Sequence, residues 1–192
     1  MKFVTTPEDE ARLTTDAKFV REETHTDVYY DTPDFALTTK DIWLRCRSGR
    51  WELKVGKGNS SEEPARQYDE IEDEAGIAEK LKLKASKGPL KERLERAGYG
   101  VCITLTTVRK KYEKDGFHID IDSVIESGQE VIEVEFMAKD ESEVPAAMKR
   151  VQEFGERYHL RRGLKRGKVA EYLRTQNPKH FEALVASGTI AA

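Results

Sequence analysis

The sequence has little cysteine and no long hydrophobic run, and each absence excludes a class of protein. Its two cysteines, Cys46 and Cys102, form no Cys-x-x-Cys pair and no zinc-type spacing with histidine. We therefore expect neither a disulfide framework nor a structural zinc, and a reducing, cytoplasmic environment suits the chain. No stretch approaches the roughly 18 consecutive apolar residues of a membrane span, which excludes an integral membrane protein. The first ten residues lack the apolar core of a signal peptide, so we expect no secretion.

An excess of charge of one sign is also lacking. The 33 basic and 36 acidic residues leave a net charge of -3. Nucleic-acid-binding proteins usually carry a basic excess, so we expect no nucleic-acid partner. Only 38% of the 192 residues are hydrophobic, yet a chain of this length can enclose a core, and we expect one domain over residues 1–192.

The spacing of apolar residues predicts an α+β fold built on antiparallel strands. Alternation and turn residues predict strands at 24–30, 42–48, 51–55, 67–72, 101–112, 117–124 and 131–137. Helical spacing and capping residues predict helices at 6–13, 75–83, 90–97 and 143–158, and a helical tail over 167–185 that Asn177-Pro178 interrupts. Gly49-Arg50 and Asp115-Gly116 predict tight hairpins. The arrangement is typical of a barrel or a strongly curved sheet.

Four predicted strands carry paired like charges on one face. A single such pair is typical of the solvated face of a half-buried strand. Like charges on a common face repel one another, however, and four such pairs indicate an anionic ligand and a cation between them. Clustered carboxylates suit Mg²⁺, and clustered Arg and Lys suit phosphate oxygens, so the pattern predicts a cavity for a metal-chelated polyphosphate. The pairs are Arg45 and Arg47, Arg109 and Lys111, Asp120 and Asp122, and Glu133 and Glu135.

Several separated motifs occur in an order that resembles a known family. They are residues 28–37 (VYYDTPDFAL), 43–47 (WLRCR), 51–54 (WELK) and 168–173 (KVAEYL), the last followed by Pro178 and Phe181. Together they resemble the CYTH superfamily of triphosphate tunnel metalloenzymes, and within it the animal-type thiamine-triphosphatases. The resemblance covers nearly the whole chain. It implies an eight-stranded antiparallel β-barrel, with helices packed outside and a charged tunnel inside.

The resemblance also implies an activity and a set of site residues. The activity would be Mg²⁺-dependent hydrolysis of thiamine triphosphate to thiamine diphosphate and phosphate. Tyr29 and Lys54 would be catalytic, by positioning or activating the attacking water. The metal ligands would be Asp120, Asp122, Glu133 and Glu135. The substrate-binding residues would be Lys2, Arg45, Arg47, Lys54, Arg109 and Lys168, with Trp43 against the cationic thiazole ring. A basic loop over 161–168 would bring Lys168 and Arg166 to the tunnel mouth.

The first strand departs from the family pattern. The family has Glu-x-Glu-x-Lys followed by Phe, whereas this chain begins Met1-Lys2-Phe3, so Lys2 fills the lysine position without the two glutamates. We favour a start that is truncated relative to the natural protein, because every other tunnel position is filled. The alternatives left open are inorganic triphosphate hydrolysis or adenylyl cyclase chemistry on the same tunnel, and a non-catalytic polyphosphate- or nucleotide-binding module. In each case we expect a monomer with a small-molecule triphosphate partner and no membrane partner.

Overall fold

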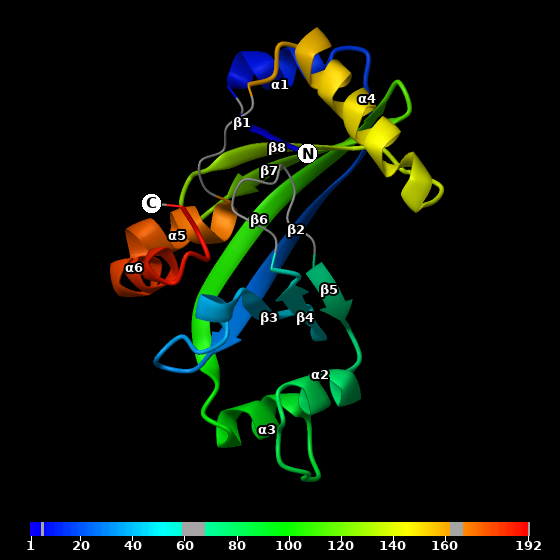
Figure 1. Cartoon of the computed structure of the whole chain (residues 1–192). Helices are drawn as coiled ribbons and strands as arrows, with labels where there is room; N and C mark the ends of the chain where they lie inside the picture. Colours follow the sequence, from blue (N-terminus) through cyan, green and yellow to red (C-terminus); the bar gives the residue numbers. More distant parts are fainter. Residues whose placement is uncertain (5, 59–67, 162–166, 192) are drawn as a thin grey trace. The chain divides into compact units, whose positions relative to one another are not determined.

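The structure, a computed structural model, describes residues 1–4, 6–58, 68–161 and 167–191 (Figure 1). The described strands form one eight-stranded antiparallel sheet in the order β1-β8-β7-β6-β2-β3-β4-β5. Their bounds are β1 Lys2–Val4, β2 Lys18–Asp31, β3 Ile42–Arg47, β4 Arg50–Gly56, β5 Tyr68–Ile71, β6 Gly100–Lys114, β7 Phe117–Val124 and β8 Glu130–Glu135. The predicted α+β class with eight antiparallel strands is confirmed. No pairing between β1 and β5, which would close a barrel, is recorded among the described residues.

The helices lie close to their predicted positions. They are α1 Pro7–Thr14, α2 Glu74–Lys80, α3 Leu90–Arg96, α4 Val144–Arg157, α5 Lys168–Gln176 and α6 Pro178–Ala186, with short 3-10 turns η1 Thr38–Lys40 and η2 Glu141–Glu143. Thr6 caps α1 as predicted: its hydroxyl accepts from the Asp9 amide, and the Asp9 carboxylate accepts from the Thr6 amide. Within the described parts of the chain, no helix combines the length and the apolar character needed to cross a membrane.

The chain divides into two compact units, and each has its own hydrophobic core. Unit 1 comprises Met1–His25 and Thr106–Gly167, and unit 2 comprises Thr26–Leu105 and Lys168–Ala192. The long strands β2 and β6 contribute residues to both units. The single domain expected over residues 1–192 stays a prediction.

The core of unit 1 lies between its strands and the helices α1 and α4. The apolar members of the alternating strands β7 and β8, such as Ile121 and Val134, are buried against Leu13 of α1 and Phe154 of α4. Because side chains alternate along a strand, Asp120 and Asp122 of β7 and Glu133 and Glu135 of β8 lie on the opposite face. Gly155 of α4 allows a close approach here, since a Cβ atom at this position would lie 2.7 Å from two ring carbons of Phe3.

The core of unit 2 lies beneath α2 and α3. Leu44 of β3 and Leu53 of β4 are fully buried and belong to one apolar cluster with Ile77 of α2 and Leu94 of α3. Cys46 packs against the same cluster, as its alternation with Arg45 and Arg47 predicts. The basic residues of β3 and β4 therefore lie on the face that the helices leave uncovered.

Two predicted boundaries were wrong. β2 begins at Lys18 rather than near residue 24, and most side chains at its start are exposed, so the first half carries no apolar alternation. The turn between β3 and β4 is Ser48-Gly49 rather than Gly49-Arg50, because both Ser48 and Gly49 adopt positive φ, at 50° and 79°. Two successive positive φ angles are the geometry of a type I′ turn, and the predicted Asp115-Gly116 hairpin has it as well, at 53° and 81°.

Candidate functional site

The first charged cluster belongs to unit 1 and is centred on Arg109 of β6. Its Nε and Nη2 donate to the two carboxylate oxygens of Asp122, at 2.6 and 2.7 Å. Its Nη1 lies 2.5 Å from Oδ2 of Asp120, and its Nη2 lies 3.5 Å from Oε2 of Glu133. The strand register produces this arrangement, because Arg109 is opposite Asp122 across β6 and β7, and Asp120 is opposite Glu133 across β7 and β8.

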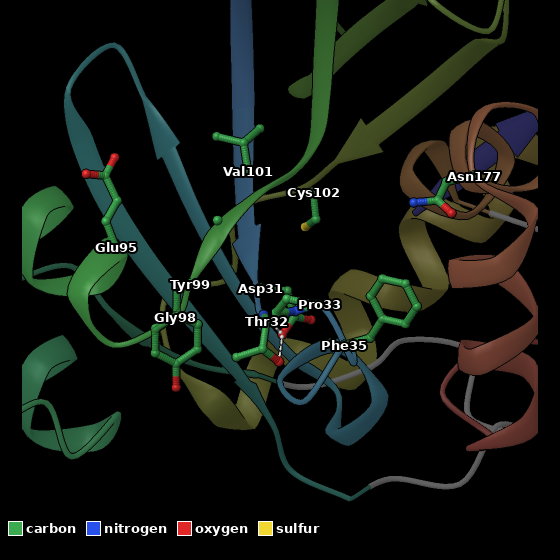
Figure 2. Close-up of a pocket in the computed structure, with 11 residues that line it drawn as sticks. Asp31, Thr32, Pro33, Phe35, Glu95, Gly98, Tyr99, Val101, Cys102 and Asn177 are labelled. Carbon is green, nitrogen blue, oxygen red and sulfur yellow. Dashed lines mark hydrogen bonds between the residues drawn. The ribbon is translucent and has the colours of Figure 1, made fainter.

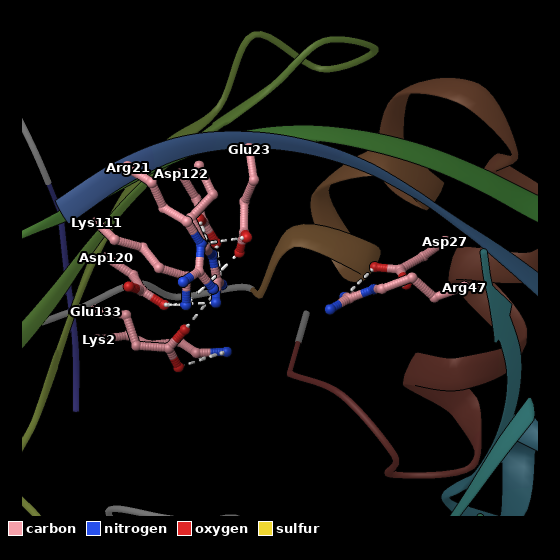
Figure 3. A network of polar contacts seen from close by, with 10 residues as sticks. Lys2, Arg21, Glu23, Asp27, Arg47, Lys111, Asp120, Asp122 and Glu133 are labelled. Atoms are coloured by element: carbon pink, nitrogen blue, oxygen red, sulfur yellow. Dashed lines mark hydrogen bonds and ion pairs between the residues drawn. The ribbon is translucent and has the colours of Figure 1, made fainter. Parts of the chain in front are cut away.

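Further charges extend this unit 1 cluster along the same strands (Figure 3). The Lys111 ammonium lies 3.4 Å from Oδ2 of Asp120 and 3.6 Å from Oε1 of Glu23. The Lys2 ammonium lies 3.6 Å from Oε1 of Glu133. Cations and carboxylates thus alternate, and Lys2 joins the cluster from β1, the strand on which the resemblance places it.

Electrostatics fix the protonation of Arg109. Burial by itself would lower the pKa of the guanidinium, but the hydrogen bonds to Asp122 and the nearby charges of Asp120 and Glu133 outweigh it and hold this pKa above its usual value. Asp122 is fully buried, and a buried carboxylate is costly unless it is paired and hydrogen-bonded. Arg109 and Asp122 therefore stabilise each other as a charged pair.

The predicted metal ligands are only partly brought together. Asp120, Asp122 and Glu133 converge on Arg109, while Glu135 is exposed and lies opposite His118 across the two strands. No group of three metal-ligating side chains is arranged to hold an ion among the residues that the structure describes. The donors are carboxylate oxygens of the kind that Mg²⁺ prefers, so their chemistry fits the ion. In this arrangement the guanidinium of Arg109 satisfies them, and the metal assignment stays a prediction.

The second charged cluster belongs to unit 2 and contains the predicted arginines of β3. Arg47 forms a bidentate pair with Asp27, at 2.6 and 2.7 Å. Arg45 donates from Nε to Oε2 of Glu52 at 2.7 Å and also lies 3.5 Å from Asp27. The Lys54 ammonium lies 2.9 Å from Oε1 of Glu52 and 2.6 Å from Oε1 of Glu70.

Sequence reasoning missed the carboxylates of this unit 2 cluster. A signal was present for two of them, because Asp27 precedes Tyr29 by two residues and Glu52 precedes Lys54 by two, so each pair shares a strand face. Glu70 could not be found locally, since its contact with Lys54 depends on the pairing of β4 with β5.

Tyr29 and Lys54, the predicted catalytic residues, are both protonated near neutral pH. Burial raises the pKa of Tyr29 to about 12, and the charge of Asp27 adds to the shift. Burial would lower the pKa of Lys54, but hydrogen bonds to Glu70 and Glu52 raise it above its usual value. Near neutral pH, a phenol and an ammonium can orient a water or a phosphate oxygen, but they cannot accept a proton from it.

Trp43 lies beside Tyr29 in unit 2. The two rings meet edge to face, with centroids 6.4 Å apart and an interplanar angle of 84°. The indole Nε1 donates to Oδ1 of Asp41 at 2.8 Å, which fixes the orientation of the ring. Lys168 is half-buried and is the first residue of α5, whereas Arg166 lies outside the described residues.

A cavity of about 410 Å³ in unit 2 is lined by none of these predicted ligands (Figure 2). The Asp31 carboxylate at its wall accepts from the amides of Thr32, Leu37 and Thr38 at 2.7–2.9 Å and from the Thr38 hydroxyl at 2.7 Å. The role of Asp31 is therefore to hold the turn after β2. Burial, together with the charge of Asp31, raises the pKa of the Cys102 thiol to about 12, so this cysteine is not a nucleophile near neutral pH.

Comparisons with known proteins find relatives that are named thiamine-triphosphatase. Human thiamine-triphosphatase is 30% identical over 143 residues, which cover 67% of this chain and 62% of the human protein. The thiamine-triphosphatase of Macaca fascicularis is 26% identical over 178 residues, which cover 84% of this chain and 77% of that protein. The matched region thus spans less than two thirds of the length of the human relative.

Solved structures share the fold. The PH1819 protein of Pyrococcus horikoshii has a TM-score of 0.62 at 20% identity, covering 91% of this chain and 97% of that one. The Hippeastrum protein HpAC1, described as a putative adenylyl cyclase with a dominant triphosphatase activity, has a TM-score of 0.58 at 14% identity, covering 90% and 93%. A family model described as the CYTH domain matches residues 1–166, and the chain therefore belongs to the CYTH family.

Proposed function

We propose that this protein hydrolyses thiamine triphosphate to thiamine diphosphate and phosphate with Mg²⁺. The observation that carries the proposal is the set of partly buried arginines on the charged strand faces: Arg45 and Arg47 in unit 2, and Arg109 in unit 1. Guanidinium groups bind phosphate oxygens with the same paired geometry that they use here for carboxylates. The names of the human and macaque relatives supply the choice of thiamine triphosphate among triphosphates.

In this proposal the basic residues bind the triphosphate and neutralise the charge that develops on the transferred phosphoryl group. A water oxygen attacks the terminal phosphorus, the bond from that phosphorus to the bridging oxygen breaks, and thiamine diphosphate leaves. One proton of the water stays on the new P–OH group, and the other passes to a phosphate oxygen. Little covalent chemistry is asked of the protein in such a reaction, so positioning and charge account for most of the acceleration. Lys2 and Lys168 add further positive charge for the phosphate oxygens.

Each remaining residue has a role that matches its protonation state. Tyr29 and Lys54 donate hydrogen bonds that hold the attacking water or an equatorial phosphate oxygen. Asp27 and Glu52 orient Arg45 and Arg47 for the substrate. Mg²⁺ held by Asp120, Asp122, Glu133 and Glu135 would shield the phosphate charge and orient the leaving group.

The substrate is tested by phosphate release from thiamine triphosphate, tripolyphosphate and ATP, measured in parallel at one Mg²⁺ concentration. We expect the highest kcat/KM for thiamine triphosphate. Trp43→Ala should lower that value and leave the value for tripolyphosphate unchanged, because only thiamine carries a cationic ring for the indole. Equal kcat/KM values for all three substrates would contradict the proposal, and tight binding without turnover would favour a non-catalytic binding module.

The site residues are tested by neutral variants from each charged cluster. Arg45→Gln in unit 2 and Lys2→Gln in unit 1 should each raise KM for thiamine triphosphate, since each removes a proposed phosphate ligand. Lys149→Gln is the matched control, because its side chain is 77% exposed on α4 and its recorded ion-pair partner is Glu153, outside both charged clusters. A variant whose KM equals that of the control shows that its cluster does not bind the substrate.

A further inference from the structure

A third group of basic residues belongs to the α2–α3 segment of unit 2, which the proposed hydrolysis does not use. Residues 80–96 contain seven basic and two acidic side chains, although the whole chain has a net charge of -3. The segment covers the last residue of α2, the loop that follows it and the whole of α3 (Figure 1). Leu90 and Leu94 of α3 are buried in the core of unit 2, so its polar residues lie on the other sides of the helix.

Four of these basic residues line a cavity of about 630 Å³, called here the α2–α3 pocket. No acidic side chain lines it. Two kinds of surface meet in it, one cationic and one apolar. The cationic lining is Lys82, Lys84, Arg93 and Arg96, and the apolar lining includes Leu83 and the ring of Tyr99.

Backbone hydrogen bonds fix both walls of the α2–α3 pocket. At the end of α2, the amide of Leu83 donates to the carbonyl of Ala78 at 2.9 Å, and Lys82 adopts a φ of 52°. This left-handed position usually holds Gly or Asn, yet here a lysine occupies it. At the end of α3, the amide of Tyr99 donates to the carbonyl of Leu94 at 3.0 Å. The pocket is therefore formed by the ends of two packed helices.

Carboxylates engage the cations of the α2–α3 pocket less closely than they engage those of the two charged clusters. Nε of Arg93 is buried and makes no hydrogen bond. Among the described residues, no ion pair is recorded for Lys82 or Lys84. Arg96 makes long contacts, at 3.3 Å to the carbonyl of Lys87, 3.5 Å to the hydroxyl of Ser86 and 4.0 Å to Glu92. An anion in the pocket would give the ammonium groups of Lys82 and Lys84 a counter-charge.

We propose that the α2–α3 pocket binds a nucleotide, with its phosphates on the four cations and its base against Tyr99 and Leu83. Lys and Arg are the side chains that bind phosphate oxygens, and an aromatic ring stacks on a planar base. The cavity volume falls within the range of about 300–1,000 Å³ that is usual for sites of organic ligands. Inorganic phosphate alone would leave the apolar lining without a partner. All the lining residues fall within 81–99, so this site shares no residue with the proposed hydrolytic site.

The test is calorimetric titration with ADP in EDTA, using the full chain and three variants. Lys82→Gln/Lys84→Gln and Arg93→Gln should each weaken ADP binding at least tenfold. The control Lys80→Gln/Lys91→Gln removes the same charge as the first variant from the same segment at positions that do not line the pocket, and it should bind ADP as the parent does. If the control lost as much ADP affinity as the pocket variants, the effect would be general electrostatic attraction, and the proposal would be overturned. No change in either pocket variant would place ADP elsewhere and overturn it too.

Two further arms define the ligand and separate this site from the hydrolytic one. Inorganic phosphate should bind at least tenfold more weakly than ADP, and Tyr99→Ala should weaken ADP and not phosphate. Phosphate binding as tight as that of ADP would contradict a nucleotide site. Arg45→Gln, which tests the hydrolytic site, should leave ADP binding unchanged, and the pocket variants should keep the parent's kcat/KM for thiamine triphosphate. Loss of ADP binding in Arg45→Gln would assign the nucleotide to the hydrolytic site instead.

Discussion

Arg109→Ala should strongly destabilise the fold, because it removes the guanidinium that donates two hydrogen bonds to the buried carboxylate of Asp122. The Asp122 side chain is 1% exposed and the Arg109 side chain is 16% exposed, and two hydrogen bonds of 2.6 and 2.7 Å join them. Removing one member of such a buried pair costs about 3–5 kcal/mol. For a protein of this size, each kcal/mol lowers Tm by about 2–4 °C, so we expect a fall of about 6–20 °C.

Two variants serve as controls for this prediction. Arg21→Ala removes an arginine from the same unit, but Arg21 and its partner Glu23 are 58% and 36% exposed. Surface pairs contribute roughly 0–1 kcal/mol, so Tm should hardly change. Arg109→Ala/Asp122→Asn removes the arginine together with the charge that it leaves behind, and it should recover most of the lost stability. A fall in Tm for Arg109→Ala no larger than for Arg21→Ala would refute the reasoning.

The same variant tests whether the carboxylates of unit 1 can hold a divalent ion. In the parent, the guanidinium of Arg109 satisfies Asp120, Asp122 and Glu133. Without it, these three carboxylates lose their shared cation, while Lys111 stays 3.4 Å from Asp120 and Lys2 stays 3.6 Å from Glu133. An ion that binds the folded state raises stability by RT ln(1 + [L]/Kd). Mg²⁺ should therefore raise the Tm of Arg109→Ala more than that of the parent. Equal shifts in differential scanning fluorimetry would count against these residues as metal ligands.

Two further predictions concern the cores and the pH dependence of stability. His180 is buried, and its Nε2 lies 2.7 Å from the hydroxyl of Thr38. Burial lowers the pKa of His180 below its ordinary value of 6.5, so the unfolded chain takes up the proton before the folded one as the pH falls. The free energy of unfolding should therefore decrease as the pH drops below 6.5. In His180→Gln, this free energy, measured by urea denaturation, should change less between about pH 7 and 5. Gly155→Ala should destabilise unit 1 by about 1–3 kcal/mol, because its Cβ atom would lie 2.7 Å from the ring of Phe3. The control is Gly100→Ala, whose Cβ atom would meet no heavy atom within 4 Å. Equal denaturation midpoints for the two variants would contradict this prediction.

The parts of the fold that follow from local pattern could be predicted from the sequence. The strand over 117–124 has its predicted bounds, because alternating apolar residues follow an Asp-Gly turn that fixes the start of the strand. The first half of β2 could not be predicted in this way. Its residues from Lys18 to Glu23 are mostly exposed, so they lack the apolar alternation that a buried face imposes.

The sequence could predict which strand face each charged residue of the candidate site occupies, but not which residues it contacts. Alternation assigned Arg45 and Arg47 to one face and Leu44 to the core, and both assignments hold in the structure. Which carboxylate each arginine contacts depends on strand register, which one sequence does not reveal. The pairing of Arg47 with Asp27, 20 residues away, arises because β2 and β3 bring these residues opposite each other.

The arginines of the two charged clusters form close ion pairs, whereas none is recorded for Lys82 or Lys84 of the α2–α3 pocket within the described parts of the chain, and this difference affects which ligand each site can bind. A ligand of the unit 2 cluster must compete with Asp27 and Glu52, and a ligand of the unit 1 cluster with Asp122, for arginines that are already hydrogen-bonded. A monophosphate merely exchanges one anion for another there, whereas a triphosphate chelated to Mg²⁺ offers more oxygens to the cations and a counter-charge to the displaced carboxylates. In the α2–α3 pocket, no ion pair is recorded for Lys82 or Lys84 among the described residues, and Glu92 lies 4.0 Å from Arg96, so a ligand displaces less there. The proposed hydrolytic site should therefore discriminate by the number of phosphates and the pocket by the base, because the pocket lining includes the apolar side chains of Leu83 and Tyr99.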